Sequence, residues 1–174
     1  PTDQYIPWTL ARVARELGKA TEIETYYERA ISLATSEEKR TIRLEYVDVL
    51  IDEDLYSTAI DQLDLLIQDD PENTASYVLL KISSSLSRAL STDAVSLPET
   101  LDPESLTDEQ KAEYWWAMAS ISYDKAIWAE ALSYIEKAIA LDDATAKYYL
   151  VKGQTLYENG RSEEAVTALE RAID

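Results

Sequence analysis

The sequence predicts an all-α fold, an α-solenoid (superhelix) of stacked antiparallel helix pairs. Apolar residues recur at helical spacing along most of the chain, and the last third aligns with itself after a shift of 34 residues. A fixed period of this length indicates stacked supersecondary units instead of one closed core. The aligned pairs within residues 112–174 are Trp115 with Tyr149, Ala119 with Gly153, Tyr123 with Tyr157, Ala131 with Ala165, Ile135 with Leu169, and Ala138 with Ala172.

The spacing within these two copies is specific. An aromatic residue is followed by Ala or Gly, then by Ala, a bulky apolar residue and a last Ala, at the same intervals in both copies. This pattern resembles the tetratricopeptide repeat (TPR), and the resemblance implies a right-handed superhelix. The small residues would let two antiparallel helices approach closely, with the aromatic ring filling the space beside them. The copies are Trp115, Ala119, Ala131, Ile135 and Ala138, then Tyr149, Gly153, Ala165, Leu169 and Ala172.

The first repeat is expected over residues 4–37. Its first helix, residues 5–17, carries an apolar stripe, and Pro7 is compatible only with the first turn of that helix. Gly18 suits the left-handed residue that ends a helix, and a second helix follows from Thr21 to Leu33. The stripe consists of Ile6, Leu10, Val13, Ala14 and Leu17, and the second helix is expected to bury Ile23, Tyr27, Ala30 and Ile31.

The second repeat is expected over residues 40–73. Its end at Asp70-Pro71-Glu72-Asn73 is typical of a TPR, because proline stops one helix and a polar residue caps the next. Two departures weaken the match without changing the helical period. Arg43 stands at the aromatic position, and Leu66 replaces the usual Ala.

The third repeat, residues 74–106, is expected to be disrupted. Pro98 would fall inside its second helix, so we expect an irregular or short-helical insertion at 91–104. Its first helix is apolar on nearly every side and should be covered. Two alternatives stay open. Either the insertion folds back over this helix through Val95, Leu97 and Leu101, or a neighbouring repeat covers it and the insertion is a surface loop.

The fourth and fifth repeats are expected over residues 112–145 and 146–174. Thr107 and Gln110 form a capping-box signature, which predicts a helix from near Thr107 to about Lys125. Asn159-Gly160 predicts a turn between the two helices of the fifth repeat. Together the five repeats predict a single TPR-like domain over residues 1–174. Its last helix is not followed by a polar capping helix, which would leave an apolar end open.

Composition argues against catalysis. The chain contains no Cys and no His, which excludes thiol nucleophiles, disulfides, His-based triads and the usual Cys/His zinc sites. Its three Gly residues form no phosphate-binding loop, and Asp52-Glu53-Asp54 lacks the Gly and the Glu of a calcium loop. We therefore expect a protein that is not an enzyme, with no catalytic residue, no cofactor and no metal site.

Charge narrows the choice of partner. The chain has 34 acidic and 16 basic residues, a net charge of −18, and nine acids but no base between residues 48 and 72. This field would repel phosphate backbones and anionic lipids, so we expect no nucleic-acid partner. These acidic residues either form a solvated face of the protein or attract a basic partner.

The sequence also bears on the membrane and the compartment. No apolar run is long enough to cross a bilayer, so we expect no direct membrane insertion. Because the chain begins at Pro1 and shows no targeting segment, we interpret it as a fragment of a soluble protein of the cytoplasm or periplasm.

The resemblance further implies a binding site. In TPR proteins, set positions of each first helix line a concave groove that holds a peptide or helix of a partner. The chaperone-tail version of this groove, a carboxylate clamp of Lys, Asn and Arg, is matched by Lys147 alone. The groove positions in this chain are Trp8, Arg12, Leu44, Asp48, Ile51, Val78, Leu79, Ile82, Trp116, Ser120, Tyr123, Lys147, Leu150, Gln154 and Tyr157.

We therefore expect a non-catalytic scaffold or adaptor that binds a peptide or helical segment of another protein. Trp116, Tyr123 and Tyr157 would be its apolar anchors, and Asp48 with the acids around it would favour a basic ligand. The alternative is a structural spacer or self-associating segment of a longer TPR protein, with copies that meet end to end.

Overall fold

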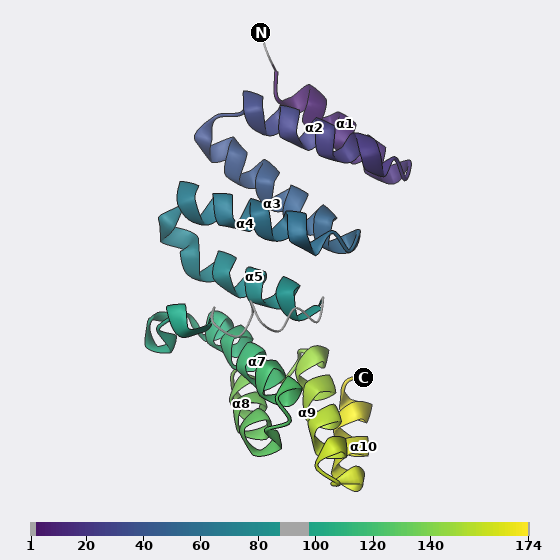
Figure 1. The fold of residues 1–174 in the computed structure, drawn as a ribbon, viewed down its shortest axis with the longest axis vertical. Coiled ribbons are helices and arrows are strands. Elements are labelled where there is room, and N and C mark those ends of the chain that lie inside the picture. The colour runs from purple at the N-terminus through teal and green to yellow at the C-terminus, as the bar shows by residue number, and fades with distance from the viewer. Residues whose placement is uncertain (1–2, 88–97, 174) are drawn as a thin grey trace. The chain divides into compact units, whose positions relative to one another are not determined.

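A computed structural model describes residues 3–87 and 98–173 (Figure 1). Within these residues all regular structure is helical and no strand occurs, which confirms the all-α solenoid of helix pairs. Short 3₁₀ turns occur at Pro71–Asn73, Pro98–Thr100 and Pro103–Ser105. The α-helices are α1 (Tyr5–Glu16), α2 (Ala20–Leu33), α3 (Ser36–Asp52), α4 (Tyr56–Asp69), α5 (Thr74–Ser87), α7 (Asp108–Asp124), α8 (Trp128–Leu141), α9 (Ala146–Glu158) and α10 (Ser162–Arg171).

The chain divides into two compact units, Pro1–Thr74 and Ala75–Asp174. In the N-terminal unit, α1 packs against α2, α2 against α3, and α3 against α4. In the C-terminal unit, α7 packs against α8, α8 against α9, α9 against α10, and the first helices α7 and α9 also touch. The grouping of all five repeats into one domain stays a prediction.

Helix ends lie where the turn and cap residues predict them. Gly18 and Gly160 have φ angles of +66° and +77°, the left-handed conformation that suits glycine. Thr107 caps α7 through the predicted capping box, in which the Gln110 backbone N–H donates to Thr107 Oγ1 and the Thr107 N–H donates to Gln110 Oε1 at 3.0 Å. A second capping box, Thr35 with Glu38 at the start of α3, follows the same pattern.

The first repeat buries a different face of its first helix from the one that the apolar stripe suggests. Ile23, Tyr27 and Ala30 of α2 are buried as predicted, whereas Ile31 is half-buried. In α1, however, the buried residues are Pro7, Ala11 and Ala14. The small side chains face α2 because they permit close approach of the two helices. The larger residues of the stripe, Ile6, Leu10, Val13 and Leu17, are exposed.

The C-terminal repeats pack as their small residues predict. Ala119, Ala131, Ile135 and Ala138 are fully buried between α7 and α8. Gly153 of α9 is buried against α10. A Cβ atom placed on Gly153 would lie 2.6 Å from Leu169 Cγ, so only glycine allows this approach.

The predicted insertion falls partly within the described residues. Its described part forms the two short 3₁₀ turns, with Pro98 buried and the first turn packed against α7, as expected of a short-helical segment. Leu101 is half-buried. Val95 and Leu97 lie outside the described residues, so the fold-back of the insertion stays a prediction.

Candidate functional site

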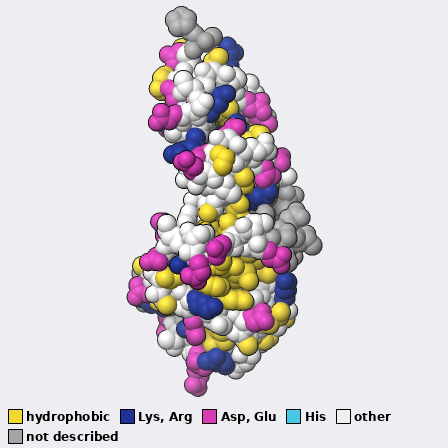
Figure 2. Space-filling model, turned by 90° about the vertical axis from the view of Figure 1, so that its left-hand side faces the viewer, with side chains coloured by type: hydrophobic (Ala, Val, Ile, Leu, Met, Phe, Trp, Pro, Cys, Tyr) yellow, Lys and Arg dark blue, Asp and Glu magenta, His cyan; other side chains and the backbone are white. Residues whose placement is uncertain are grey.

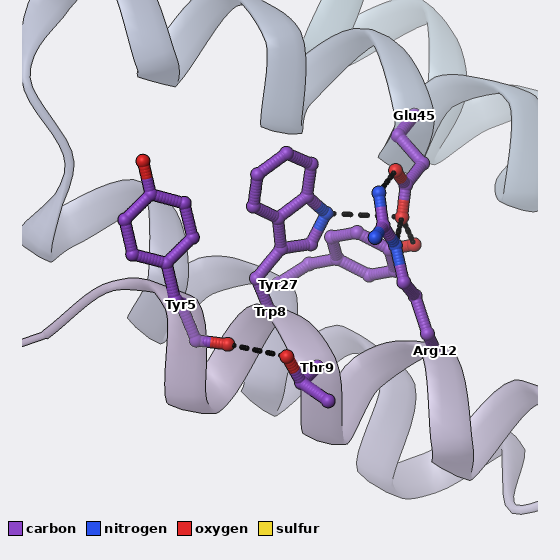
Figure 3. Close-up of polar contacts among 6 residues, drawn as sticks. All are labelled: Tyr5, Trp8, Thr9, Arg12, Tyr27 and Glu45. Carbon is purple, nitrogen blue, oxygen red and sulfur yellow. Dashed lines mark hydrogen bonds and ion pairs between the residues drawn. The ribbon is translucent and has the colours of Figure 1, made fainter.

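On the groove face of the N-terminal unit, two of the predicted groove side chains contact one carboxylate of the protein (Figure 3). Glu45 of α3 accepts hydrogen bonds from Trp8 Nε1 at 3.0 Å, from Arg12 Nε at 2.8 Å and from the Tyr27 hydroxyl at 2.7 Å. A second nitrogen of Arg12 forms an ion pair with the same carboxylate. The Arg12 guanidinium also lies 4.4 Å from the centre of the Trp8 ring. We call these four residues the Glu45 cluster.

Protonation of the Glu45 cluster follows from its contacts. Partial burial alone would raise the pKa of Glu45, but the hydrogen bonds from Arg12, Tyr27 and Trp8 outweigh it and hold the pKa below its usual value. Burial, followed by the hydrogen bond to Glu45, raises the pKa of the Tyr27 hydroxyl well above its usual value. The cluster is therefore an ionised carboxylate with its donors satisfied, which ties α1, α2 and α3 together.

The other N-terminal groove positions differ in exposure. Asp48 is exposed, and loss of hydration followed by repulsion from Asp52 raises its pKa. Leu44 and Ile51 are half-buried. Asp48 is thus the most accessible acidic side chain among the groove positions of this unit.

The groove positions on α5 are closed to solvent. Val78 and Leu79 are buried, and Ile82 is fully buried. Burial of this helix agrees with its apolar pattern, but a buried side chain cannot contact a ligand until its neighbours move. We therefore assign these three residues to packing, and their role in binding stays a prediction.

On the C-terminal unit, the groove positions of α7 and α9 form an accessible surface. We call it the α7–α9 wall, and it consists of Trp116, Ser120, Tyr123, Lys147, Leu150, Gln154 and Tyr157. Leu150 is 44% exposed and Tyr157 64% exposed, and Gln154 is exposed between them. The α7 residues of the wall are half-buried. Figure 2, which looks at the left-hand side of the view in Figure 1, shows hydrophobic side chains gathered in the lower half of the picture, with acidic and basic side chains around them.

Trp116 and Lys147 are held together within this wall. The Lys147 ammonium lies 4.2 Å from the centre of the Trp116 ring and forms an ion pair with Glu113 at 2.6 Å. Glu113 also accepts a hydrogen bond from the Tyr148 hydroxyl at 2.9 Å. The Trp116 ring packs against the core cluster of α7 and α8, and its buried Nε1 has no hydrogen-bond partner among the described residues. Trp116 is therefore part core and part wall.

Two more α7 residues of the wall have internal contacts. The Ser120 hydroxyl donates to the Trp116 carbonyl one turn earlier at 3.0 Å, so it is already satisfied. The Tyr123 ring lies 5.6 Å from that of Trp128. Burial, and then the nearby charges of Glu158 and Asp124, raise the pKa of Tyr123. The wall is thus electronegative around Tyr123.

A hollow of about 440 Å³ adjoins the wall within the C-terminal unit. A hydrogen bond of 3.0 Å from Gln110 Nε2 to Ser76 Oγ joins its two sides. It is lined by Ser76, Leu79, Leu80 and Ser83 of α5 and by Thr107, Glu109, Gln110, Glu113 and Lys147.

Sequence reasoning missed the roles of Glu45 and Glu113. The signal that identifies Glu113 is spacing, because Glu113 and Lys147 lie 34 residues apart in consecutive repeats. Glu45 and Arg12 lie 33 residues apart, also in consecutive repeats. Residues one repeat apart lie side by side on stacked first helices. An acid one repeat from a base on these faces therefore predicts an ion pair.

Across residues 3–87 and 98–173, no group of three or more acidic side chains is placed to hold a metal ion. Within the same residues, no helix is long and apolar enough to cross a membrane.

Stacked helix pairs with an accessible first-helix face define a helical-repeat scaffold. Residues 117–174 match a family model described as tetratricopeptide repeat. This match confirms the predicted TPR resemblance over the last third of the chain. The comparison with curated proteins found no match.

Solved structures share the fold at low sequence identity. A MamA protein is 16% identical with a TM-score of 0.67, and the match covers 98% of this chain and 90% of that chain. A MamA fragment from Desulfovibrio magneticus RS-1 is 13% identical with a TM-score of 0.71, covering 98% and 93%. YrrB, described as a TPR protein with an unusual peptide-binding site, is 18% identical with a TM-score of 0.57, covering 99% and 86%.

Proposed function

We propose that this protein is a non-catalytic scaffold that binds an extended or helical segment of another protein along the α7–α9 wall. The observation that carries the proposal is the pair Leu150 and Tyr157 on α9. Both are large, both are exposed, and they lie two turns apart on the helix that touches α7. TPR proteins as a family are interaction modules, and among the similar folds YrrB has a peptide-binding site.

The chemistry of the wall favours an apolar side chain beside a basic one. An apolar side chain of the ligand would be buried between Leu150 and Tyr157, where desolvation stabilises binding most. A lysine or arginine of the ligand would meet the acids near Tyr123, namely Glu158 and Asp124. The net charge of −18 would speed the approach of such a ligand.

The Glu45 cluster suits a different role in this proposal. Because Trp8 and Arg12 are already bonded to Glu45, a ligand would have to break those bonds before it used them. We assign this cluster to holding α1 and α3 in register, while Asp48 stays available as an acidic contact.

The test is selection of peptides from a randomised display library on the chain of residues 1–174. Affinities of the selected peptides are then measured by fluorescence anisotropy on variants. We expect Tyr157→Ala and Leu150→Ala each to weaken binding about five- to thirty-fold, as interface anchors do. The affinity should also fall as salt rises, since a basic ligand is attracted by charge.

Leu141→Ala is the matched control. Leu141 is exposed to a similar degree as Leu150, at 40%, but it lies at the end of the second helix α8. Its replacement should leave the affinity unchanged. Trp116→Ala is a poorer test, because the ring also packs against the core. Equal affinity of the wild type, Tyr157→Ala and Leu150→Ala would refute the α7–α9 wall as the site.

A further inference from the structure

The apolar stripe on α1 is exposed although the same face is buried in other first helices. Aligning the start of the first repeat with that of the second places Ile6, Leu10 and Val13 on Ile42, Tyr46 and Val49 of α3. Those three α3 residues are each at most 1% exposed. The α1 residues and Leu17 are between 41% and 64% exposed. We call Ile6, Leu10, Val13 and Leu17 the N-terminal face.

In the second and fifth repeats this face packs against the preceding helix pair. Tyr46 of α3 stacks on Tyr27 of α2, with ring centres 4.7 Å apart. Tyr148 of α9, at the position of Ile6, is buried in a cluster formed with α7 and α8 residues. The N-terminal face therefore has the shape and chemistry of a surface that docks on the end of a TPR helix pair.

An end of that kind exists on the same molecule, in the α9–α10 pair. Val166 of α10 is 55% exposed, whereas Leu132, the same position one repeat earlier, is 8% exposed and packs with Leu156, Ala165 and Ala168. Ile173 is 86% exposed, whereas Ile139 at the same position packs against the cluster that contains Tyr148.

A hollow of about 610 Å³ adjoins these residues. It is lined by Tyr149, Lys152, Leu156, Glu164, Thr167, Ala168, Glu170 and Arg171. We call Val166, Ile173 and this hollow the C-terminal face.

We infer that two copies of this protein associate head to tail, with the N-terminal face of one copy on the C-terminal face of the other. The contact continues the α8–α9 interface: α1 of the second copy lies against α9 and α10 as α9 lies against α7 and α8. It is heterologous, because the two faces are different surfaces of one chain. A hollow of about 420 Å³ beside Ile6 and Leu10 of the N-terminal face is lined by Asp3 and Arg29 among others, so the hollows at both faces carry both signs of charge.

Charge distinguishes this contact from peptide binding on the wall. Each copy carries a net charge of −18, so copies repel one another at long range. Apolar burial is not screened by salt, whereas this repulsion is. Association should therefore strengthen as salt is added, the reverse of the salt effect expected for a basic peptide.

The test is analytical ultracentrifugation of residues 1–174 over a range of protein and salt concentrations. The wild type should show reversible, concentration-dependent association. Leu10→Glu on the N-terminal face and Val166→Glu on the C-terminal face should each reduce the association constant more than about tenfold, because a charge replaces a buried apolar group. Leu150→Glu, a leucine of similar exposure on the α7–α9 wall, should leave association unchanged.

Mixing the two variants gives the decisive result. Leu10→Glu keeps an intact C-terminal face and Val166→Glu an intact N-terminal face, so the mixture should form a one-to-one dimer and nothing larger. A wild type that stays monomeric under all conditions overturns the inference, as does a mixture that stays monomeric. Loss of association in Leu150→Glu alone would mean that copies meet through the wall instead.

Discussion

Replacing Glu45 is expected to destabilise the N-terminal unit more than replacing any exposed acid on its surface. Glu45→Ala leaves the Tyr27 hydroxyl without an acceptor, and this residue is only 1% exposed. A buried polar group left unpaired costs about 1–3 kcal/mol. The lost bond from Trp8 Nε1 adds about 1 kcal/mol. The ion pair with Arg12 adds at most about 1 kcal/mol, because the Arg12 side chain is 55% exposed. The expected loss is about 3 kcal/mol.

Urea unfolding followed by far-UV circular dichroism measures this loss. Glu28→Ala, which removes an exposed acid from α2, is the control and should change stability by less than about 0.5 kcal/mol. Tyr27→Phe should cost about 1–1.5 kcal/mol in the wild type. When Glu45 is already Ala, the same change should leave stability unchanged or raise it, because it removes a buried hydroxyl that has lost its acceptor. A loss from Glu45→Ala no larger than that of the control would refute the bonded cluster.

Glu45 should also make the stability of the folded protein fall at low pH. The hydrogen bonds to Glu45 hold its pKa in the folded state below the usual value of 4.5. The unfolded chain therefore binds the proton more readily, so this contribution is complete above about pH 4.5 and is lost as pH falls through the folded-state pKa. Glu45→Ala should flatten the acid side of the stability–pH curve. If stability still falls at low pH as steeply in Glu45→Ala as in the wild type, other carboxylates cause the acid sensitivity.

Two further substitutions test packing. Tyr46→Phe should leave stability unchanged or raise it by up to about 1 kcal/mol, because the buried Tyr46 hydroxyl, in contrast to that of Tyr27, has no hydrogen-bond partner in the part of the chain that the structure describes. A clear loss of stability in urea unfolding would contradict this. Gly153→Ala should lower the thermal midpoint of the C-terminal unit, because overpacking against Leu169 costs about 1–3 kcal/mol and exceeds the helix-propensity gain of about 1 kcal/mol. When Leu169 is also replaced by Ala, Gly153→Ala should no longer carry that overpacking cost. If the double variant instead loses the sum of the two single losses, the overpacking explanation is wrong.

Much of the fold follows from local signals in the sequence. The capping box at Thr107 and the left-handed glycines at 18 and 160 are set by backbone geometry within a few residues, so pattern reasoning locates them. The spacing of small residues from Ala119 to Ala138 also predicts the packing of α7 on α8, because close approach requires small side chains at those positions.

The stripe on α1 shows where such reasoning stops. Helical periodicity identifies a row of apolar residues, but it cannot tell which of two faces meets the partner helix. In α1 the small residues Ala11 and Ala14 face α2, and the larger Leu10 and Val13 are left outside. The choice depends on the distance between the helices, which only the assembled pair defines.

The predicted groove residues also differ in ways that the sequence does not reveal. The TPR resemblance places Trp8, Val78 and Tyr157 on corresponding helix faces, but their surroundings differ. Trp8 is bonded to Glu45, Val78 is buried, and Tyr157 is exposed. A repeat pattern specifies a position on a helix, whereas availability depends on what the neighbouring helix places opposite it.

The sequence by itself determined the class of fold, the helix ends and the resemblance to TPR repeats, because these depend on periodicity, caps and spacing along the chain. Only the tertiary structure decided that Glu45 holds Trp8 and Arg12, that Lys147 lies on Trp116, and that α1 presents an apolar face outward. The physical reason is distance: hydrogen bonds, ring contacts and burial depend on atoms brought within a few ångströms by stacking, and residues a full repeat apart become neighbours only when the helices pack.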